Sequence, residues 1–168
     1  MKNKVISICG IKTMTTLITG KQDSGKTTRL LEHYKIHQQG DGFALLKQMK
    51  GTDVLGFVAM RLSTGETKSL LTHQGTIKSE DHPMKIGPYL VDIDVYQEMM
   101  ETYRNMILQK VNPIYIDEVG RWELSGQGFD AIIKEALRAS IDLILTVRDS
   151  FLDQVMDHYH LHGTCVML

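Results

Sequence analysis

Residues 20–27, Gly20-Lys21-Gln22-Asp23-Ser24-Gly25-Lys26-Thr27, satisfy the pattern Gly-x4-Gly-Lys-Ser/Thr. Leu17-Ile18-Thr19, immediately before them, is typical of a buried strand, and the segment that follows, 28–32, is typical of a helix. A glycine-rich loop between a strand and a helix points successive backbone N–H groups at one place, and the helix N-terminus adds positive potential there. The sequence therefore predicts a phosphate-binding loop rather than an ordinary glycine-rich turn.

Two residues of this loop have specific expected roles. The ammonium group of Lys26 is expected beside the β- and γ-phosphates of a nucleotide, and the hydroxyl of Thr27 is expected to ligate Mg²⁺. The residues expected to bind the nucleotide are Gly20, Lys21, Gln22, Asp23, Ser24, Gly25, Lys26, Thr27 and Thr28.

A second informative segment is Ile114-Tyr115-Ile116-Asp117-Glu118. Apolar residues followed by an acidic pair place carboxylates at the C-terminal end of a buried parallel strand, where ligand sites of α/β proteins open. We expect Asp117 to hold Mg²⁺ and Glu118 to orient or deprotonate the attacking water. A solvated strand end is the alternative, and the intact phosphate loop favours the functional interpretation.

Weaker candidates follow this acidic pair in the sequence. Thr146 and Arg148 end the next predicted strand, which we expect beside the strand of the phosphate loop. There Thr146 would sense the γ-phosphate and Arg148 would stabilise transition-state charge, although an exposed, salt-bridged arginine is equally compatible with the sequence. Arg121 and Glu123 are near the acidic pair by connectivity alone.

The histidines form two groups with metal-ligand spacing. His33 and His37 are four residues apart, and His158, His160 and His162 alternate near the C-terminus. Neither group has a carboxylate or cysteine at motif spacing, so solvated surface histidines are the favoured interpretation over a transition-metal site.

Composition restricts the class of protein. The chain has 168 residues, of which 42% are hydrophobic and 23% charged, and its formal net charge is −1. These values are typical of one globular domain, and they disfavour a nucleic-acid partner, which usually requires a basic excess. Cys9 and Cys165 have no nearby cysteine partner, and no apolar segment reaches the roughly 20 residues of a membrane span. We expect a cytoplasmic monomer without a membrane partner.

Short apolar runs alternate with amphipathic segments and predict an α/β fold with a mainly parallel sheet. Strands are expected at 15–19, 43–47, 54–62, 67–71, 113–116, 141–147 and 164–168, and helices at 27–38, 95–109, 129–139 and 150–158. Glycines at 40, 42, 51, 56, 65 and 75 predict antiparallel strands at one edge of the sheet. Residues 1–13 are expected to be an N-terminal extension and residues 14–168 a single domain.

The motifs resemble those of the small P-loop nucleoside-triphosphatases that include the cancer-related nucleoside-triphosphatase. The resemblance runs from Thr15 almost to the C-terminus. It rests on the phosphate loop, on Asp117-Glu118-Val119-Gly120-Arg121-Trp122-Glu123-Leu124, on Gly42-Phe43 and Gly56-Phe57, and on Gly87-Pro88-Tyr89-Leu90-Val91. It implies a three-layer sandwich with a RecA-like sheet. It also implies Mg²⁺-dependent hydrolysis of nucleoside 5'-triphosphates, including ATP and GTP, to diphosphate and phosphate, with a broad base preference and with Glu118 as the catalytic glutamate.

Two segments depart from the family's pattern. Gln22-Asp23 replaces Pro-Gly in the loop, and Lys47-Gln48-Met49 stands where the family has Glu-Val-Arg. Asp23 adds a negative charge near bound phosphates, so we expect weaker nucleotide affinity. The chain also ends at Leu168, before the family's following segment with its Asn-Arg pair.

Two other functions are compatible with the same motifs. A small-molecule kinase would need several arginines over the transferred phosphate, whereas the arginines here are widely scattered. A nucleotide-binding switch with little turnover would report occupancy to a protein partner, and the altered loop is compatible with that alternative.

Overall fold

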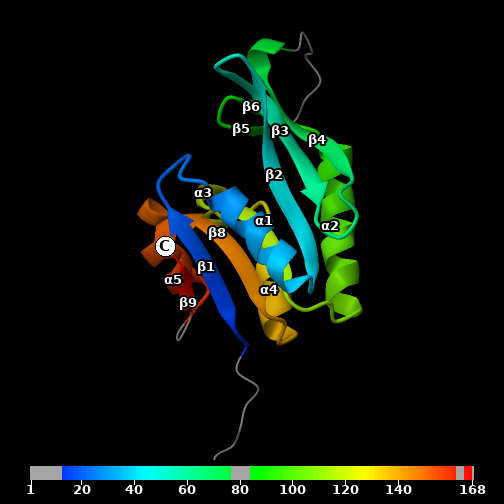
Figure 1. Ribbon diagram of the computed structural model, residues 1–168, viewed down its shortest axis with the longest axis vertical. Helices are drawn as coiled ribbons and strands as arrows, with labels where there is room; N and C mark the ends of the chain where they lie inside the picture. Colours follow the sequence, from blue (N-terminus) through cyan, green and yellow to red (C-terminus); the bar gives the residue numbers. More distant parts are fainter. Residues whose placement is uncertain (1–12, 77–83, 162–164, 168) are drawn as a thin grey trace, which may run out of the picture.

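A nine-stranded sheet forms the centre of the computed structural model, which describes residues 13–76, 84–161 and 165–167 (Figure 1). The strands are β1 (Thr15–Gly20), β2 (Asp41–Lys50), β3 (Asp53–Arg61), β4 (Thr67–His73), β5 (Lys85–Ile86), β6 (Tyr89–Val91), β7 (Ile114–Val119), β8 (Leu143–Arg148) and β9 (Cys165–Met167). The α-helices are α1 (Lys26–His37), α2 (Ile93–Leu108), α3 (Arg121–Leu124), α4 (Asp130–Arg138) and α5 (Leu152–His158). Short 3₁₀ helices cover Gln74–Thr76 and Asp149–Phe151.

The sheet order, β5-β6-β4-β3-β2-β7-β8-β1-β9, divides into two parts. Strands β2, β7, β8, β1 and β9 are parallel, and β8 lies between β7 and β1. The carboxyl ends of β1, β7 and β8 therefore meet at one edge of the sheet, as the sequence predicts for the phosphate loop and the acidic pair.

The other part of the sheet is antiparallel. Strands β3, β4, β6 and β5 extend the sheet from β2 by antiparallel pairing, and in Figure 1 they stand above the parallel strands. Only Asp41–Phe43 of β2 pair with β7, so the rest of β2 continues without pairing to β7. This part of β2 lies beside the predicted site, where the N–H of Leu45 contacts Asp117.

Helices cover both faces of the sheet, which confirms the predicted three-layer α/β fold. Helix α1 packs through Leu30 on Ile18, Tyr115 and Ile144. Helices α2, α4 and α5 cover the opposite face with a larger apolar cluster. Strands β1, β7 and β8 of the parallel part are buried on both faces, which explains their nearly continuous apolar sequences.

The structure corrects the predicted elements at several points. Strand β7 includes Asp117 and Glu118 and ends at Val119, beyond the predicted end at Ile116. The short elements α3, β5 and β6 were not predicted, because two to four residues carry too little periodicity. Residues 1–12 of the predicted extension lie outside the described residues, as do Thr164 and Leu168 at the two ends of the last predicted strand. Within the described ranges, no helix has the length and apolar character needed to cross a bilayer.

A buried carboxylate joins the two helices behind β8. Asp130, at the start of α4, is 5% exposed and accepts hydrogen bonds from Lys134 Nζ at 2.7 Å and Tyr159 OH at 3.0 Å. His158 Nε2 lies 2.9 Å from Oδ1, the same oxygen that accepts the hydrogen bond from Tyr159. Burial raises the pKa of Asp130, but the hydrogen bonds from Lys134, His158 and Tyr159 outweigh it, and the pKa falls below its ordinary 3.8.

We predict that Asp130→Asn lowers the free energy of unfolding by about 1–3 kcal/mol at pH 7, because an amide cannot accept all of these hydrogen bonds. A group with a depressed pKa in the folded state stabilises above its unfolded pKa and loses this effect as the pH falls. The difference between the two proteins should therefore shrink below about pH 4 in urea titrations.

The matched control is Asp157→Asn, an exposed carboxylate on the neighbouring helix α5. Its effect should stay within about 0.5 kcal/mol. An equal loss of stability in both variants would contradict the structural role of Asp130.

Candidate active site

The phosphate loop lies between β1 and α1, as the sequence predicts, and two glycines explain its backbone. Gly25 has φ = 83°, a left-handed conformation that favours glycine, and it caps the first turn of α1. A Cβ atom on Gly20 would lie 2.4 Å from Ser24 Oγ, so a side chain there would displace the loop. The loop residues 21–25 are exposed, whereas Lys26 is 4% exposed at the start of the helix.

Asp117 is the most extensively hydrogen-bonded carboxylate of this edge. Its Oδ2 accepts hydrogen bonds from Thr27 Oγ1 and from the backbone N–H of Leu45, both at 2.9 Å. Its Oδ1 accepts one from Thr146 Oγ1 at 2.5 Å. Burial raises the pKa of Asp117, and these hydrogen bonds oppose that rise. The carboxylate therefore connects α1, β2 and β8 to β7.

Glu118 adopts an unusual backbone conformation beside Asp117. Its φ is 61°, in the left-handed region that residues with side chains seldom adopt, and pairing of β7 with β8 is interrupted between Ile116 and Val119. The N–H of Glu118 donates to Thr146 Oγ1 at 2.7 Å, which stabilises the interruption. Left-handed residues of this kind often occur at functional sites.

The electrostatic surroundings of Glu118 combine burial with charges of both signs. Burial and the neighbouring Asp117 raise the pKa of Glu118, while Lys26, Arg148 and Lys47 lower it. The pKa of Glu118 is raised on balance. A carboxyl group with a raised pKa in a partly buried site is a stronger base than an ordinary glutamate.

Cationic side chains surround the phosphate loop and contact its oxygen atoms. Lys26 Nζ donates to the Lys21 carbonyl at 2.7 Å, and Arg148 Nη1 donates to Gln22 Oε1 at 3.2 Å. Lys47, from β2, forms an ion pair with Asp23. Arg148 thus lies at the loop, whereas Lys47 is a further cation to which sequence reasoning gave no role.

The structure brings together only some of the weaker candidates. Thr146 is fully buried and its hydroxyl is engaged by Asp117 and Glu118, so it positions these two residues. Glu123 is 3% exposed and accepts hydrogen bonds from the N–H groups of Gly120 and Phe129, which gives it a structural role in the chain that leaves β7. Arg121 is exposed and lies over the ring of Phe151, with 5.9 Å between its Cζ and the ring centroid.

The histidines do not gather into a metal site in the described part of the chain. The rings of His33 and His37 stack on α1, and His33 Nδ1 lies 3.0 Å from the Tyr115 hydroxyl. His158 is bound to Asp130, and His162 lies outside the described residues. Among these described residues, no group of three or more His, Cys, Asp and Glu side chains could hold a metal ion.

The oxygen ligands expected for Mg²⁺ do lie together. The Thr27 hydroxyl and the Asp117 carboxylate are in direct contact, and hydroxyl and carboxylate oxygens are the ligand type that Mg²⁺ prefers. The ion usually completes its coordination with water and nucleotide phosphates, so two protein ligands are sufficient. The donor set fits this ion.

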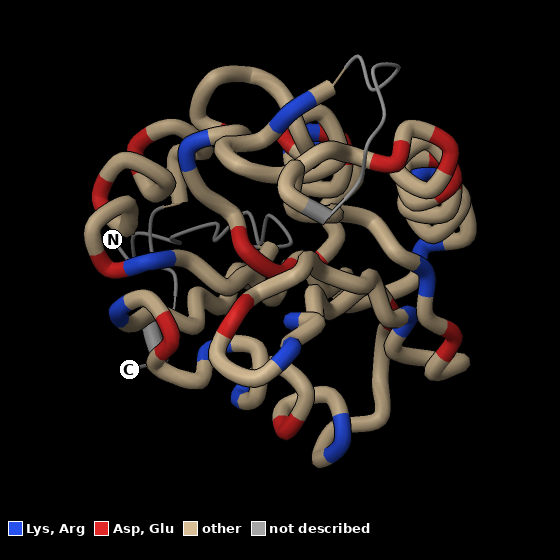
Figure 2. The backbone as a smooth tube through the Cα atoms, turned by 90° about the horizontal axis from the view of Figure 1, so that it is seen from above, with Lys and Arg blue, Asp and Glu red and all other residues tan. Residues whose placement is uncertain are grey.

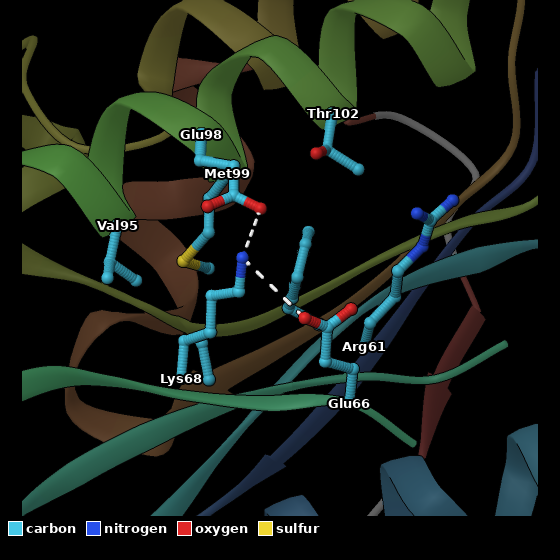
Figure 3. A pocket seen from close by; sticks show the side chains of 9 residues that line it. Arg61, Glu66, Lys68, Val95, Glu98, Met99 and Thr102 are labelled. Carbon is cyan, nitrogen blue, oxygen red and sulfur yellow. Dashed lines mark hydrogen bonds and ion pairs between the residues drawn. The ribbon is translucent and has the colours of Figure 1, made fainter. Parts of the chain in front are cut away.

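A small, partly open pocket lies away from the loop, between β2, β3, β4 and α2 (Figure 3). Its volume is about 40 Å³, far less than a nucleotide occupies. Lys68 points into it and contacts Glu98 at 2.5 Å and Glu66 at 3.6 Å. The charged groups there satisfy one another, so this cavity does not compete with the loop as a nucleotide site.

Substitution of two buried threonines tests how much the hydrogen bonds around Asp117 stabilise the protein. Thr146→Val removes the donor to Asp117 and the acceptor for Glu118 N–H, and it should lower the free energy of unfolding by about 1–3 kcal/mol. Thr19→Val is the matched control, because the Thr19 hydroxyl is equally buried and has no hydrogen-bond partner in the described structure. Thr19→Val should be neutral or stabilising in urea unfolding, and equal losses in both variants would contradict the role of Thr146.

Comparison with known proteins places this site in a family. Residues 15–167 match the family model described as NTPase. The nucleoside-triphosphatase THEP1 of Thermotoga maritima is 27% identical over 139 residues, which cover 82% of this chain and 75% of that protein. The protein of the same name from Methanocaldococcus jannaschii is 26% identical over 153 residues, which cover 89% and 86%.

A solved structure supports the same fold. The solution structure of a human cancer-related nucleoside triphosphatase superposes with a TM-score of 0.63 and 21% identity, over 92% of this chain and 88% of that one. The match to the family model includes both the phosphate loop and the acidic pair. These findings confirm the resemblance seen in the motifs: the chain belongs to the NTPase family and is an enzyme of the hydrolase class.

Proposed function

We propose that this chain hydrolyses nucleoside 5'-triphosphates to the diphosphate and phosphate, with Mg²⁺ held by Thr27 and Asp117. The contact of 2.9 Å between Thr27 Oγ1 and Asp117 Oδ2 carries this proposal. It joins a residue of the phosphate loop to the acidic pair, which are 90 positions apart in the sequence. Two independent motifs that meet at hydrogen-bond distance favour one composite site over two unrelated local features.

The loop and its lysine bind the substrate in this proposal. The backbone N–H groups of the loop would bind the phosphates, and the N-terminus of α1 adds positive potential there. Lys26 moves from the Lys21 carbonyl to the β- and γ-phosphates, where a charged acceptor replaces a neutral one. Thr27 and Asp117 would hold Mg²⁺, which would neutralise part of the phosphate charge when bound.

Glu118 and Arg148 act on the reacting atoms. Glu118 accepts the proton of the attacking water, and its raised pKa supports a role as base. The Arg148 guanidinium gives up its hydrogen bond to the Gln22 side chain and binds the γ-phosphate oxygens instead. Negative charge is spread over these oxygens in the transition state. Thr146 is a positioning residue because it acts through Asp117 and the N–H of Glu118.

The base of the nucleotide has little influence on this chemistry. All the residues assigned above interact with phosphates, water or the metal ion, and the names of the relatives specify nucleoside triphosphates without a particular base. We therefore propose that ATP, GTP, CTP and UTP are all substrates.

Substitution of Lys26 and Glu118 tests this proposal. Lys26→Ala should abolish measurable phosphate release because it weakens nucleotide binding, whereas Glu118→Gln should lower release by roughly 10²–10⁴-fold and still bind nucleotide. Release is measured with each of the four triphosphates, with and without Mg²⁺, and binding by calorimetry.

The control for Glu118 is Glu32→Gln, an exposed glutamate on α1, which should leave the rate unchanged. Equal rates for the unaltered chain and Glu118→Gln would refute the role of Glu118. Tight binding without release by the unaltered chain would instead favour a nucleotide-binding switch, and transfer of phosphate to an acceptor other than water would favour a kinase.

A further inference from the structure

The phosphate loop is surrounded by cations that all contact loop oxygens. The contacts are Lys26 with the Lys21 carbonyl, Arg148 with the Gln22 side-chain carbonyl, Lys47 with the Asp23 carboxylate and Arg29 with the Ser24 carbonyl. Four consecutive loop residues thus each accept a hydrogen bond from a basic side chain. Asp23 differs from the others because it alone is an anion, so its contact with Lys47 is an ion pair.

The position of Lys47 is fixed by the same carboxylate that organises the site. Strand β2 continues beyond its pairing with β7, and the N–H of Leu45 donates to Asp117 Oδ2 at 2.9 Å. Lys47 is two residues further along β2, and its ammonium group reaches Asp23 of the loop. Lys47 also interacts electrostatically with Glu118.

The ion pair itself is exposed and easily exchanged. The Asp23 side chain is 59% exposed and that of Lys47 39% exposed. Exposed pairs of this kind contribute little net stability, because water and ions screen them. A phosphate group offers more negative charge and three acceptor oxygens, and it therefore competes effectively for an ammonium group that is already beside the loop.

We propose that Asp23 and the terminal phosphate of a bound triphosphate compete for Lys47, so that Lys47 is a residue that distinguishes triphosphate from diphosphate. This inference rests on the proposed function, because it assumes that the loop binds nucleotide phosphates. Asp23 holds Lys47 at the rim of the site, and a terminal phosphate takes the ammonium group from it. A diphosphate lacks that group and leaves the ion pair intact.

Charges of both signs are distributed over the described part of the structure, so a single cation at the loop can have a local effect. Seen from above, Lys and Arg are interspersed with Asp and Glu around the molecule (Figure 2). The formal net charge of −1 gives no general attraction for polyphosphates. Discrimination by the number of phosphates then depends on individual cations, and Lys47 is the one whose present partner carries a full opposite charge.

Binding of β,γ-imido-ATP and ADP, each with Mg²⁺, tests the proposal by calorimetry. Lys47→Gln should weaken binding of the imido analogue roughly tenfold and change binding of ADP by no more than about twofold. The reason is that only the imido analogue has a terminal phosphate for Lys47. Asp23→Asn should strengthen binding of the imido analogue about three- to fivefold, since the substitution frees Lys47 and removes a negative charge that repels the phosphates. The ratio of the two dissociation constants therefore moves in opposite directions in the two variants.

The control is Lys50→Gln, an exposed lysine on the same strand, which should leave both affinities unchanged. All four proteins should unfold at similar temperatures, because Asp23, Lys47 and Lys50 are exposed. A Lys47→Gln variant that weakens both nucleotides equally, or neither, overturns the proposal and shows at most a structural ion pair.

The two proposals fail in different ways. Suppose that the unaltered chain releases phosphate, and that Lys47→Gln leaves the ratio of the dissociation constants for the imido analogue and ADP unchanged. This result would refute the transfer of Lys47 from Asp23 to the terminal phosphate and leave the proposed function intact. An unaltered chain that binds both nucleotides but releases no phosphate refutes hydrolysis, and a changed ratio then still supports the role of Lys47. Absence of binding for both nucleotides refutes both.

Discussion

The carboxylate of Asp117 is the contact on which the rest of the site depends. It is 3% exposed and accepts hydrogen bonds from a loop side chain, a backbone N–H of β2 and a side chain of β8. A buried carboxylate is costly unless such donors surround it, so its presence requires the strands and the loop to converge. The site is therefore fixed by the sheet order, in which β7 lies between β2 and β8.

This convergence explains why an unusual backbone is tolerated at Glu118. A left-handed residue at the interruption of a parallel pair costs conformational energy, and the hydroxyl of Thr146 compensates by accepting the Glu118 N–H. The hydroxyl of Thr146 thus holds the Asp117 carboxylate and the N–H of the adjacent Glu118 in a defined relation. The loop is restrained differently, by the buried Lys26 and by contacts of Arg148 and Lys47 at the protein surface.

Much of the fold follows from the sequence, because buried parallel strands and amphipathic helices have strong patterns. The strands predicted at 15–19 and 141–147 agree with β1 and β8 to within one or two residues at each end. The phosphate loop and the acidic pair were found from motifs, and their proximity follows from the rule that carboxyl ends of parallel strands share one edge. Short elements such as α3 and β5 are stabilised by tertiary contacts and leave little trace in the sequence.

The contacts that refine the site were harder to predict. The N–H of Leu45 has no side-chain signature, and the ion pair of Asp23 and Lys47 joins residues 24 positions apart. Thr146 was expected to sense the γ-phosphate, whereas its hydroxyl is engaged by the acidic pair. The side chain of a strand-end residue can point to a ligand or to a neighbouring strand, and only the packing of β7 against β8 decides between them.

The most direct test of the composite site is the Mg²⁺ dependence of phosphate release by the unaltered chain and by Asp117→Asn. If Thr27 and Asp117 together hold the ion, release by the unaltered chain requires Mg²⁺. The variant should then release phosphate at least about 100-fold more slowly and need a higher Mg²⁺ concentration for half-maximal rate. The same rate and the same Mg²⁺ dependence in both proteins would show that Asp117 is not part of the reacting site.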